Sequence, residues 1–403
     1  MIDYKHFVSD VYLAESEIQN FFYKKKKKQA NNFGYIPNLY AYEWVISSSL
    51  FNIILFILKI MWPIVLILFN VITLVIYIVK KIRLACVREK GEINDSILFA
   101  SSDAAVKLYD KAVVDECTIV FRPGRMDCNE KEMQSSFDAL QIIGFYCLFC
   151  VLLKATYISL FLGYNSKYSE YRFLSFYVFE LLVVSESLKA LNSASLKKQL
   201  FVTDHYDRWA LMADYLREVS YSKLTIIQHG VLAVGETSFD VLIPKKLSGV
   251  DSLYFFDELS KAVFIEKIFS PSLNPRFVNF NNGLELTALD VDCPSILIVG
   301  CPVSFDFHLA LSDYINLNID EIKIFYKPHP TSIGYGRSKN KHWVWVDDVD
   351  YFPEVDLVIS YPSSLATQYQ SKEIPVFIHE IDETGSAVYA AYSHIYSYLE
   401  SVL

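Results

Sequence analysis

Cysteine is scarce in this 403-residue chain, and its seven residues follow no framework spacing. An odd, irregular set of cysteines excludes a disulfide scaffold and is typical of reduced thiols in a cytoplasmic setting. Cys147 and Cys150 match a CxxC string, but they lie in an apolar stretch, so we interpret both as small apolar side chains of a buried helix. A signal peptide is not expected, because the first apolar run begins only after residue 43.

Glycine-rich phosphate loops are also missing. The glycines at 230, 235 and 334 form neither a GxGxxG nor a P-loop pattern. Positive charge is concentrated in residues 1–90, which contain 12 Lys/Arg and 6 Asp/Glu, whereas the remaining residues contain 25 and 40. The later part shows no basic stripe with interleaved aromatic residues, so no nucleic acid is expected as a partner. The basic end instead suits acidic lipid headgroups.

Charged residues are almost absent between Trp44 and Val79, where Lys59 is the one charged side chain in 36 residues. A single helix of this length would measure about 54 Å, against about 30 Å for the hydrocarbon core of a bilayer. Pro63 lies near the middle, where it would break a helix, so the run predicts a membrane-inserted hairpin. The positive-inside tendency would keep both flanks cytoplasmic, since each carries basic residues: Lys24 to Lys28 before, and Lys80, Lys81 and Arg83 after.

Two other interpretations of this run stay open: a single tilted span from about Ile60 to Val79, and a buried helix pair of a soluble domain. A second apolar stretch, Ala139 to Gly163, is interrupted by Gln141 and Lys154. Because of these polar residues, a helix resting on the bilayer or a hydrophobic helix of the first domain fits better than a further insertion.

Short apolar runs alternate with helix-length segments along the rest of the chain, which predicts βαβ units, parallel sheets and the α/β class. A Pro- and Asn-rich stretch predicts a linker at 271–293. The predicted parts are a basic cytoplasmic segment (1–43), the membrane hairpin or membrane-associated helices (44–83), an N-terminal Rossmann-like domain (84–270), the linker (271–293), a second domain (294–383) and a C-terminal helix (384–403).

Polar residues follow several of the predicted strands directly. His229 comes after an apolar run, His329 follows another between Pro328 and Pro330, and two hydroxyls, Ser363 and Ser364, stand where a helix should begin. In open α/β sheets, ligands collect outside the carboxyl ends of the strands. The pattern therefore predicts a phosphate-bearing substrate handled by two histidines that face each other across a cleft between the domains.

Each candidate also has a purely structural interpretation. His229 is our candidate for the catalytic base, since a neutral imidazole accepts a proton near pH 7, but it could be packed in a turn. His329 and Lys327 would hold phosphate from a rigid strand end, although the prolines could merely end the strand. Ser363 and Ser364 are good helix caps in any case. Gly300 allows close backbone approach in the first turn of the second domain.

A polar cluster after the strand ending at Thr203 is a candidate acceptor site or a support for the base. Helix capping would explain part of it. Two neighbours of His229 are assigned to the same role. The cluster is Asp204, His205, Asp207 and Arg208, and the neighbours are Gln228 and Gly230.

Together these motifs resemble bacterial GT-B transferases of surface polysaccharide synthesis, over about residues 200–380. Sialyltransferases and polysialyltransferases carry an acidic base motif, an HP motif and a serine pair, and teichoic acid glycerophosphotransferases carry His-Gly in place of the acidic motif. The motifs that carry the resemblance are Gln228-His229-Gly230, Ile298 to Pro302, Tyr326 to Pro330 and Tyr361 to Ser364.

The resemblance implies a GT-B fold of two Rossmann-like domains facing a cleft, with an acceptor domain at 84–270 and a nucleotide-donor domain at 294–383. It implies a metal-independent, inverting glycosyltransferase at the cytoplasmic face of the bacterial inner membrane. Its co-substrate would be a nucleotide sugar such as a CMP-activated nonulosonic acid, with no other cofactor, and its acceptor would be a lipid-linked glycan. Donor phosphate would meet His329, Ser363 and Ser364, and His229 would replace the acidic base. A CDP-polyol phosphotransferase and a non-catalytic membrane-anchored assembly protein remain alternatives.

Overall fold

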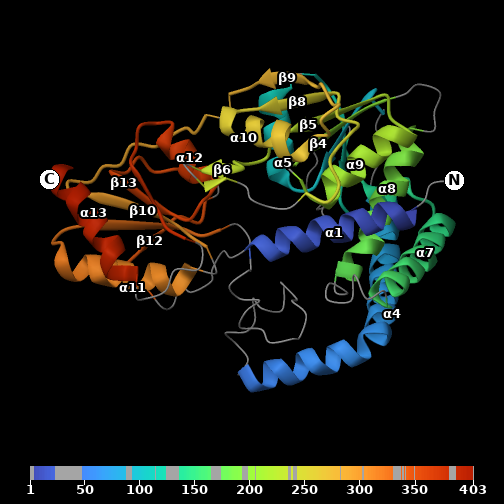
Figure 1. Ribbon diagram of the computed structural model, residues 1–403, viewed down its shortest axis with the longest axis horizontal. Coiled ribbons are helices and arrows are strands. Elements are labelled where there is room, and N and C mark those ends of the chain that lie inside the picture. The colour runs from blue at the N-terminus through green and yellow to red at the C-terminus, as the bar shows by residue number, and fades with distance from the viewer. Residues whose placement is uncertain are drawn as a thin grey trace. The chain divides into compact units, whose positions relative to one another are not determined.

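In the computed structural model the chain forms two compact units, each built on a parallel β-sheet (Figure 1). Unit 1 comprises residues 1–233 and 238–282, and unit 2 comprises residues 234–237 and 283–403. The predicted α/β class with parallel sheets is thereby confirmed. The structure describes residues 4–22, 48–87, 93–113, 115–123, 136–164, 174–192, 198–204, 206–234, 237–238, 243–281, 283–301, 304–329, 337, 340, 342–348, 350–380 and 387–402.

A seven-stranded sheet in the order β3-β2-β1-β4-β5-β8-β9 forms the centre of unit 1, and its pairings are parallel. Most of its strands are short buried runs, as expected for a sheet covered on both faces. The strand order reverses between β1 and β4, so the topological switch point lies there. The strands are β1 (Ser96–Ala100), β2 (Thr118–Phe121), β3 (Ser136–Asp138), β4 (Gln199–Thr203), β5 (Lys223–Ile227), β8 (Ser252–Phe255) and β9 (Arg276–Asn279). A separate two-stranded sheet joins β6 (Ala233–Val234) and β7 (Thr237–Ser238).

Side chains alternate between the two faces of this sheet. In β1, Ile97 and Phe99 belong to the large core formed with α1, α8 and α9, whereas Leu98 and Ala100 belong to a smaller core formed with α5. The helices of unit 1 besides the two apolar ones described below are α1 (Tyr4–Phe22), α5 (Asp103–Ala112), α6 (Ala139–Ile142), α8 (Val178–Asn192), α9 (Arg208–Val219) and α10 (Glu258–Val263), which continues into a π-helical turn, Phe264–Ile268.

Helix α1 lies within the segment predicted to be basic and cytoplasmic (1–43), and it packs against the rest of unit 1. Phe7, Val8, Val11 and Tyr12 recur with helical spacing on one face, and all four are buried in the large core of unit 1. The first turns of the chain are therefore part of the α/β unit. The lysines at 24–28 lie outside the described residues.

The predicted hairpin at Pro63 is not what this segment forms. Residues Ser48–Val87 make one helix, α4, with Pro63 inside it, and Figure 1 shows α4 as two arms joined at a bend. A proline removes one backbone hydrogen bond and kinks a helix, but it does not have to reverse the chain. Two described helices are long and apolar enough to cross a membrane by length and composition alone: Ile60–Ala85 within α4, and α7 (Phe145–Tyr164).

Unit 2 contains a five-stranded parallel sheet in the order β12-β11-β10-β13-β14. Its core lies on both sides of β10, whose five residues are all buried. Here the order reverses between β10 and β13, which defines the switch point. The elements are β10 (Ser295–Val299), α11 (Phe305–Asn318), β11 (Lys323–Lys327), β12 (Val344–Trp345), β13 (Leu357–Ser360), α12 (Ser364–Gln370), β14 (Val376–Ile378) and α13 (Val388–Val402).

The segment predicted as a C-terminal helix forms helix α13, and the predicted linker is divided between the two units. The units divide between residues 282 and 283, inside the predicted linker 271–293, but β9 lies in that segment too and is a strand of the first sheet. Helix α13 packs Val388, Ala391, Ile395 and Leu399 into the core of unit 2, so it belongs to that unit.

Candidate functional site

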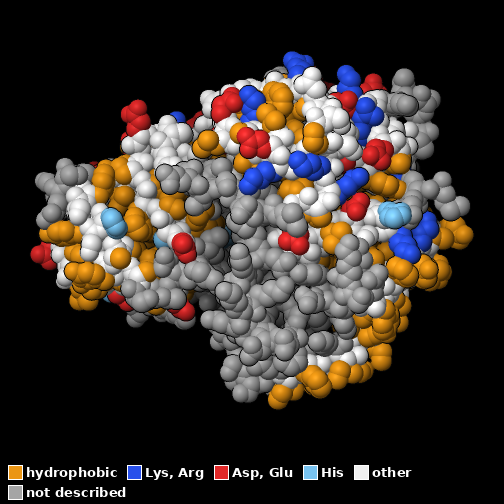
Figure 2. Space-filling view, in the orientation of Figure 1, with side chains coloured by type: hydrophobic (Ala, Val, Ile, Leu, Met, Phe, Trp, Pro, Cys, Tyr) orange, Lys and Arg blue, Asp and Glu red, His pale blue; other side chains and the backbone are white. Residues whose placement is uncertain are grey.

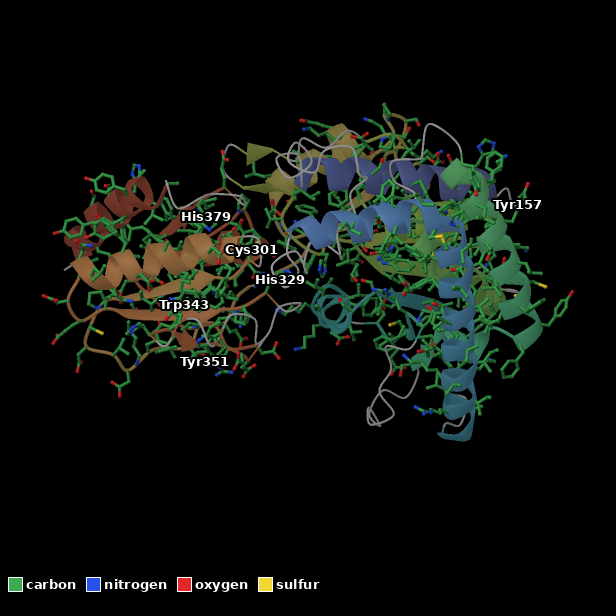
Figure 3. All side chains as sticks on the ribbon, turned by 90° about the horizontal axis from the view of Figure 1, so that it is seen from below. Tyr157, Cys301, His329, Trp343, Tyr351 and His379 are labelled. Carbon is green, nitrogen blue, oxygen red and sulfur yellow. The ribbon has the colours of Figure 1, made fainter. Side chains whose placement is uncertain are left out.

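Residues predicted to bind the donor lie at the carboxyl ends of three neighbouring strands of unit 2, and His379, which was not predicted, follows a fourth. Along the sheet, β11 leads to His329, β10 to Gly300 and Cys301, β13 to Ser363, and β14 to His379. In Figure 3 the labelled Cys301 and His329 lie close together, with His379 further along the same end of the sheet. The structure thus brings the predicted donor residues to one edge, at the switch point where α/β sheets bind ligands.

His329 is half-buried after the buried Pro328, and burial lowers the pKa of its imidazole. The ring is therefore mainly neutral at pH 7, and its N–H can donate to a phosphate oxygen. Pro330, which was predicted to fix the other side of His329, lies outside the described residues.

Lys327, predicted to bind phosphate, is buried and holds the neighbouring loop. Its Nζ donates to the carbonyl oxygens of Asp348 at 2.7 Å and Tyr351 at 2.9 Å, and it lies 4.5 Å from the ring centroid of Phe352. Burial lowers the pKa of Lys327 to about 8, while Asp348 and Asp350 oppose that change. Two of the three N–H donors thus fasten the strand end to residues 348–351, so its first role is structural.

Gly300 is required by packing at this edge. A Cβ atom built on Gly300 would lie 2.6 Å from Oη of Tyr326, well inside van der Waals contact. Tyr326 in turn stacks on Trp343, with ring centroids 4.2 Å apart and planes 4° apart. The predicted close approach at Gly300 is therefore an approach of its backbone to a tyrosine of the adjacent strand.

The hydroxyls after β13 form a short hydrogen-bonded chain. Ser363 caps α12 by accepting from the backbone N–H of Ala366 at 3.1 Å, and its Oγ lies 3.0 Å from Oγ of Ser360. Ser364 is the first residue of α12 and is half-buried. Helix α12 has only seven residues, so its dipole alone does not define an anion site.

A buried histidine pair, which the sequence analysis missed, lies beside this edge. His308 of α11 and His379 after β14 approach with their Nε2 atoms 2.8 Å apart, and Nδ1 of His379 lies 2.7 Å from the carbonyl oxygen of Glu380. Since that carbonyl can only accept, Nδ1 of His379 carries the proton and Nε2 accepts from His308. Burial lowers the pKa of both rings, and of His308 well below the ordinary value.

The histidine pair is connected by a backbone hydrogen bond to Ser360, which precedes the serines after β13. The backbone N–H of His379 donates to the carbonyl oxygen of Ser360 at 2.9 Å, which joins α11, β14 and β13. The one sequence signal for His308 is its spacing: it follows Phe305 by three residues, on the buried face of α11. That spacing predicts burial but gives no partner. Within the described parts of the chain, no group of three or more His, Cys, Asp or Glu side chains is arranged to hold a metal ion.

The predicted base lies at the carboxyl edge of the other sheet. His229 follows β5, and Asp204 and Asp207 follow the adjacent β4, whose end is joined to β5 by a 3.1 Å bond from the Asp204 N–H to the Ile227 carbonyl oxygen. The side chain of His229 reaches solvent, yet the protein around it lowers its pKa, and the negative charge of Asp207 opposes that change. The result is a mainly neutral imidazole within electrostatic reach of Asp207, whose own pKa is raised by burial, and such an arrangement is suitable for a general base.

The rest of the predicted polar cluster has structural partners. Asp207 caps α9 by accepting from the N–H groups of Trp209 at 2.7 Å and Ala210 at 3.0 Å. Arg208 lies 3.9 Å from Glu15 of α1 and 4.4 Å from the ring centroid of Tyr177. Glu15, which sequence reasoning missed, thus joins α1 to this edge. His205 lies outside the described residues.

Gln228 holds the loop that carries His229. Its fully buried amide donates to the carbonyl oxygen of Gly230 at 2.8 Å and to the carboxylate of Asp257, and it accepts from the N–H of Phe256 at 3.0 Å. These bonds fix the backbone of the loop and so help to hold His229, the predicted base, in place. His229 belongs to unit 1 and His329 to unit 2, so their pairing across a cleft stays a prediction.

Comparison with known proteins gives little further information. No protein-family model matches the chain, and no characterised protein matches its sequence. Among solved structures, the chain is similar to the spinosyn rhamnosyltransferase SpnG complexed with spinosyn aglycone, with a TM-score of 0.42 and 12% sequence identity. The similarity covers 75% of this chain and 91% of that one. A likeness at this level carries no argument about the activity of this protein.

Proposed function

We propose that this protein is a membrane-associated glycosyltransferase of GT-B type, which transfers a sugar from a nucleotide donor to a lipid-linked surface polysaccharide, O-antigen or capsule acceptor. One observation carries the proposal. His329, Gly300 and Ser363 follow three adjacent parallel strands of unit 2, at the switch point of its sheet. This is the edge at which open α/β sheets bind nucleotides and phosphates.

The donor phosphate would be held at that edge by neutral hydrogen-bond donors. The imidazole N–H of His329 and the hydroxyl of Ser364 donate to phosphate oxygens, and Ser363 fixes the turn that presents Ser364. Lys327 would act mainly by fixing the loop at 348–351 through its two hydrogen bonds to backbone carbonyl oxygens. These bonds would also set the direction of its third N–H group.

The acceptor hydroxyl would lose its proton to His229. Its neutral imidazole takes the proton as the sugar transfers, and the carboxylate of Asp207 stabilises the imidazolium that forms. Attack by an activated hydroxyl on the face opposite the departing nucleotide inverts the anomeric centre, so we propose an inverting reaction. A CMP-activated nonulosonic acid is the donor suggested by the HP and serine motifs.

Membrane association is part of the proposal. The outward sides of α4 and α7 expose large apolar side chains in series, including Ile72 at 59% and Tyr157 at 66% exposure. Soluble proteins rarely expose so large an apolar surface. We propose that these helices hold the enzyme at the cytoplasmic face of the bacterial inner membrane, next to its lipid-linked acceptor.

A CDP-polyol phosphotransferase is the second candidate, and His229 is the observation that favours it. The glycerophosphotransferases of teichoic acid synthesis carry His-Gly at this position, as His229 and Gly230 do here. In that reaction the same base would activate an acceptor hydroxyl that attacks phosphorus in place of an anomeric carbon.

A thermal-shift panel with CMP, CDP, UDP, GDP and their sugar or polyol conjugates tests the proposal. A ligand at 100 times its dissociation constant stabilises the protein by about 2.7 kcal/mol, which is readily measured. We expect a cytidine nucleotide to stabilise the wild type and to stabilise His329→Ala much less. His394→Ala, at an exposed position of α13, is the matched control.

Hydrolysis of the donor separates the two candidates, since release of CMP from a CMP-sugar supports sugar transfer and release of CMP from a CDP-polyol supports phosphotransfer. If no nucleotide binds and His329→Ala leaves polysaccharide synthesis in cells unchanged, the proposal fails. A non-catalytic assembly protein would then be the better description.

A further inference from the structure

An extended exposed apolar surface is built by two helices that are far apart in the sequence. We call it the apolar face and define it as the exposed apolar side chains of α4 from Ile60 to Ile82 and of α7 from Phe145 to Tyr164. Figure 2 shows it as a band of hydrophobic side chains along the lower right of the molecule. Such a surface needs a nonpolar partner.

Helices α4 and α7 run antiparallel, and three contacts fix their register. The ring of Trp62 lies 6.0 Å from that of Tyr164, the amide of Asn70 donates to Oγ1 of Thr156 at 3.0 Å, and Nζ of Lys81 lies 5.2 Å from the ring of Phe145. Helix α4 therefore does belong to an antiparallel pair of apolar helices. The sequence analysis predicted such a pair within a single segment, but the second helix of the pair is α7.

The inner side of α4 packs on the α/β unit along this whole length. Nε1 of the buried Trp62 donates to Oγ of Ser175 at 3.3 Å, and the ring of the buried Tyr77 lies 5.5 Å from that of Phe179. Helix α7 packs likewise on the buried α8. Both helices thus lie along the surface of unit 1.

Charged groups lie directly behind the apolar face. Tyr77 is within electrostatic reach of Glu180, Arg122 and Asp138, and Arg122 and Glu180 form an ion pair of 2.7 Å. If α4 crossed a bilayer, these charges would lie deep in hydrocarbon, at a cost of several kcal/mol. An orientation in the membrane plane leaves them above the headgroups.

The apolar face is hollowed and has a basic edge. A hollow of about 350 Å³ lies between the helices, lined by Ile67, Val71 and Leu153 among others, and a second of about 450 Å³ lies beside Tyr157 and Phe161. Along the side of α7 nearest α1, Nζ of Lys5 lies 3.5 Å above the ring of Phe161, and the exposed Lys154 lies 5.4 Å from the ring of Tyr4. Apolar hollows with cations beside them complement acyl chains with anionic headgroups.

We propose that the apolar face lies flat in one leaflet of an anionic lipid bilayer, with α4 from Ile60 to Ile82 and α7 both in the membrane plane and with Lys5 and Lys154 at the headgroups. This rests on the proposed membrane association and adds its geometry: the protein enters one leaflet and does not cross.

Depth measurement along α4 tests this geometry. A fluorescent noncanonical residue is introduced singly at Ile64, Val75 or Ile82, three exposed positions in line over about 27 Å of helix. The full-length protein is bound to vesicles of phosphatidylglycerol and phosphatidylcholine that carry a nitroxide quencher either shallow or deep in the acyl chain. We expect strong quenching by the shallow label and weak quenching by the deep label, equal at all three positions. Leu259, an exposed apolar residue of α10, is the control position and should show none.

Each other result overturns the proposal. A spanning helix gives deep quenching at Val75 and shallow quenching at the two ends. Absence of quenching at all three positions, with a doubled mass in solution, means that a second copy covers the face. If the same protein in detergent still responds to nucleotide in the thermal-shift panel, the membrane geometry fails alone and the proposed catalytic function stands.

The basic edge is tested separately. Lys5→Ala and Lys154→Ala should each weaken partitioning into anionic vesicles about fivefold, since a basic residue near such a surface contributes about 1 kcal/mol. Binding to neutral vesicles should not change. Lys246→Ala, at a partly exposed lysine of unit 1 whose Nζ donates to the carbonyl oxygen of Glu266, is the matched control. Equal effects of the three substitutions would contradict a headgroup contact at Lys5 and Lys154.

Discussion

The carboxyl edges of the two sheets place a histidine in different surroundings. His329 of unit 2 is half-buried, and burial alone lowers its pKa, whereas His229 of unit 1 reaches solvent and has the carboxylate of Asp207 nearby. A nearby carboxylate stabilises the imidazolium that a base becomes, whereas burial keeps an imidazole neutral as a hydrogen-bond donor. The same residue type at equivalent strand ends is thus suited to proton transfer in unit 1 and to phosphate binding in unit 2.

The largest expected effect is on the rate when His229 is replaced. His229→Ala should reduce kcat by about 10²–10⁴-fold at saturating donor, which is the usual contribution of a general base. Nucleotide binding should not change, because the donor residues belong to unit 2. Initial rates and thermal shifts measure the two effects, and His6→Ala, at an exposed position of α1, is the control. A loss of nucleotide binding with unchanged kcat would reverse the two assignments.

The second effect is on donor affinity. His329→Ala should raise the dissociation constant of the nucleotide roughly 10–100-fold, since a hydrogen bond to a charged group contributes about 1.5–3 kcal/mol. Titration calorimetry measures it, with His394→Ala as the control in the same unit. An unchanged dissociation constant would remove His329 from the donor site and leave it as a residue that ends a strand.

Acid should destabilise unit 2 through its buried histidine pair. The pKa values of His308 and His379 are lowered in the folded protein, so below a pH of about 6.5, the pKa of an unfolded histidine, the unfolded chain binds more protons than the folded protein. The free energy of unfolding therefore decreases as the pH decreases. Each neutral histidine contributes up to about 1.4 kcal/mol per pH unit in that window.

Urea unfolding of the wild type and of a His308→Leu/His379→Phe variant at pH 7 and pH 5 measures this contribution. The free energy of unfolding should fall less in the double variant than in the wild type. His308→Leu alone leaves Nε2 of buried His379 without its donor and should cost about 1–3 kcal/mol at pH 7. Equal pH dependence in wild type and double variant would show that the pair does not titrate in this range.

The smallest effect is expected at Asp207. Asp207→Asn keeps a side-chain oxygen that can cap α9 but removes the charge that raises the pKa of His229. That pKa should then fall further, so the acidic limb of the pH–rate profile should move to lower pH with little loss of stability. A limb that does not move would mean that Asp207 acts on α9 alone and that the two histidine sites differ less than their surroundings indicate.

Much of unit 2 could be predicted locally. Its strands β10, β11 and β13 are short apolar runs whose residues are mostly buried, and the candidate residues lie at their carboxyl ends or follow them closely in the chain. Unit 1 was harder to predict at its ends. Helix α1 was not predicted, because the nearby lysine cluster dominated the interpretation of this segment. Pro63 was taken to indicate a chain reversal, but a proline is equally compatible with a bent helix.

The order of apolar runs and the polar residues that end them were determined by the sequence itself, because periodicity and strand ends are properties of neighbouring residues. Partners were decided only by the tertiary structure. Helix α4 pairs with α7, His308 bonds to His379 across 71 positions, and Lys327 holds the loop at 348–351. Such pairings depend on which strands and helices become neighbours in space, and no local pattern of side chains encodes that choice.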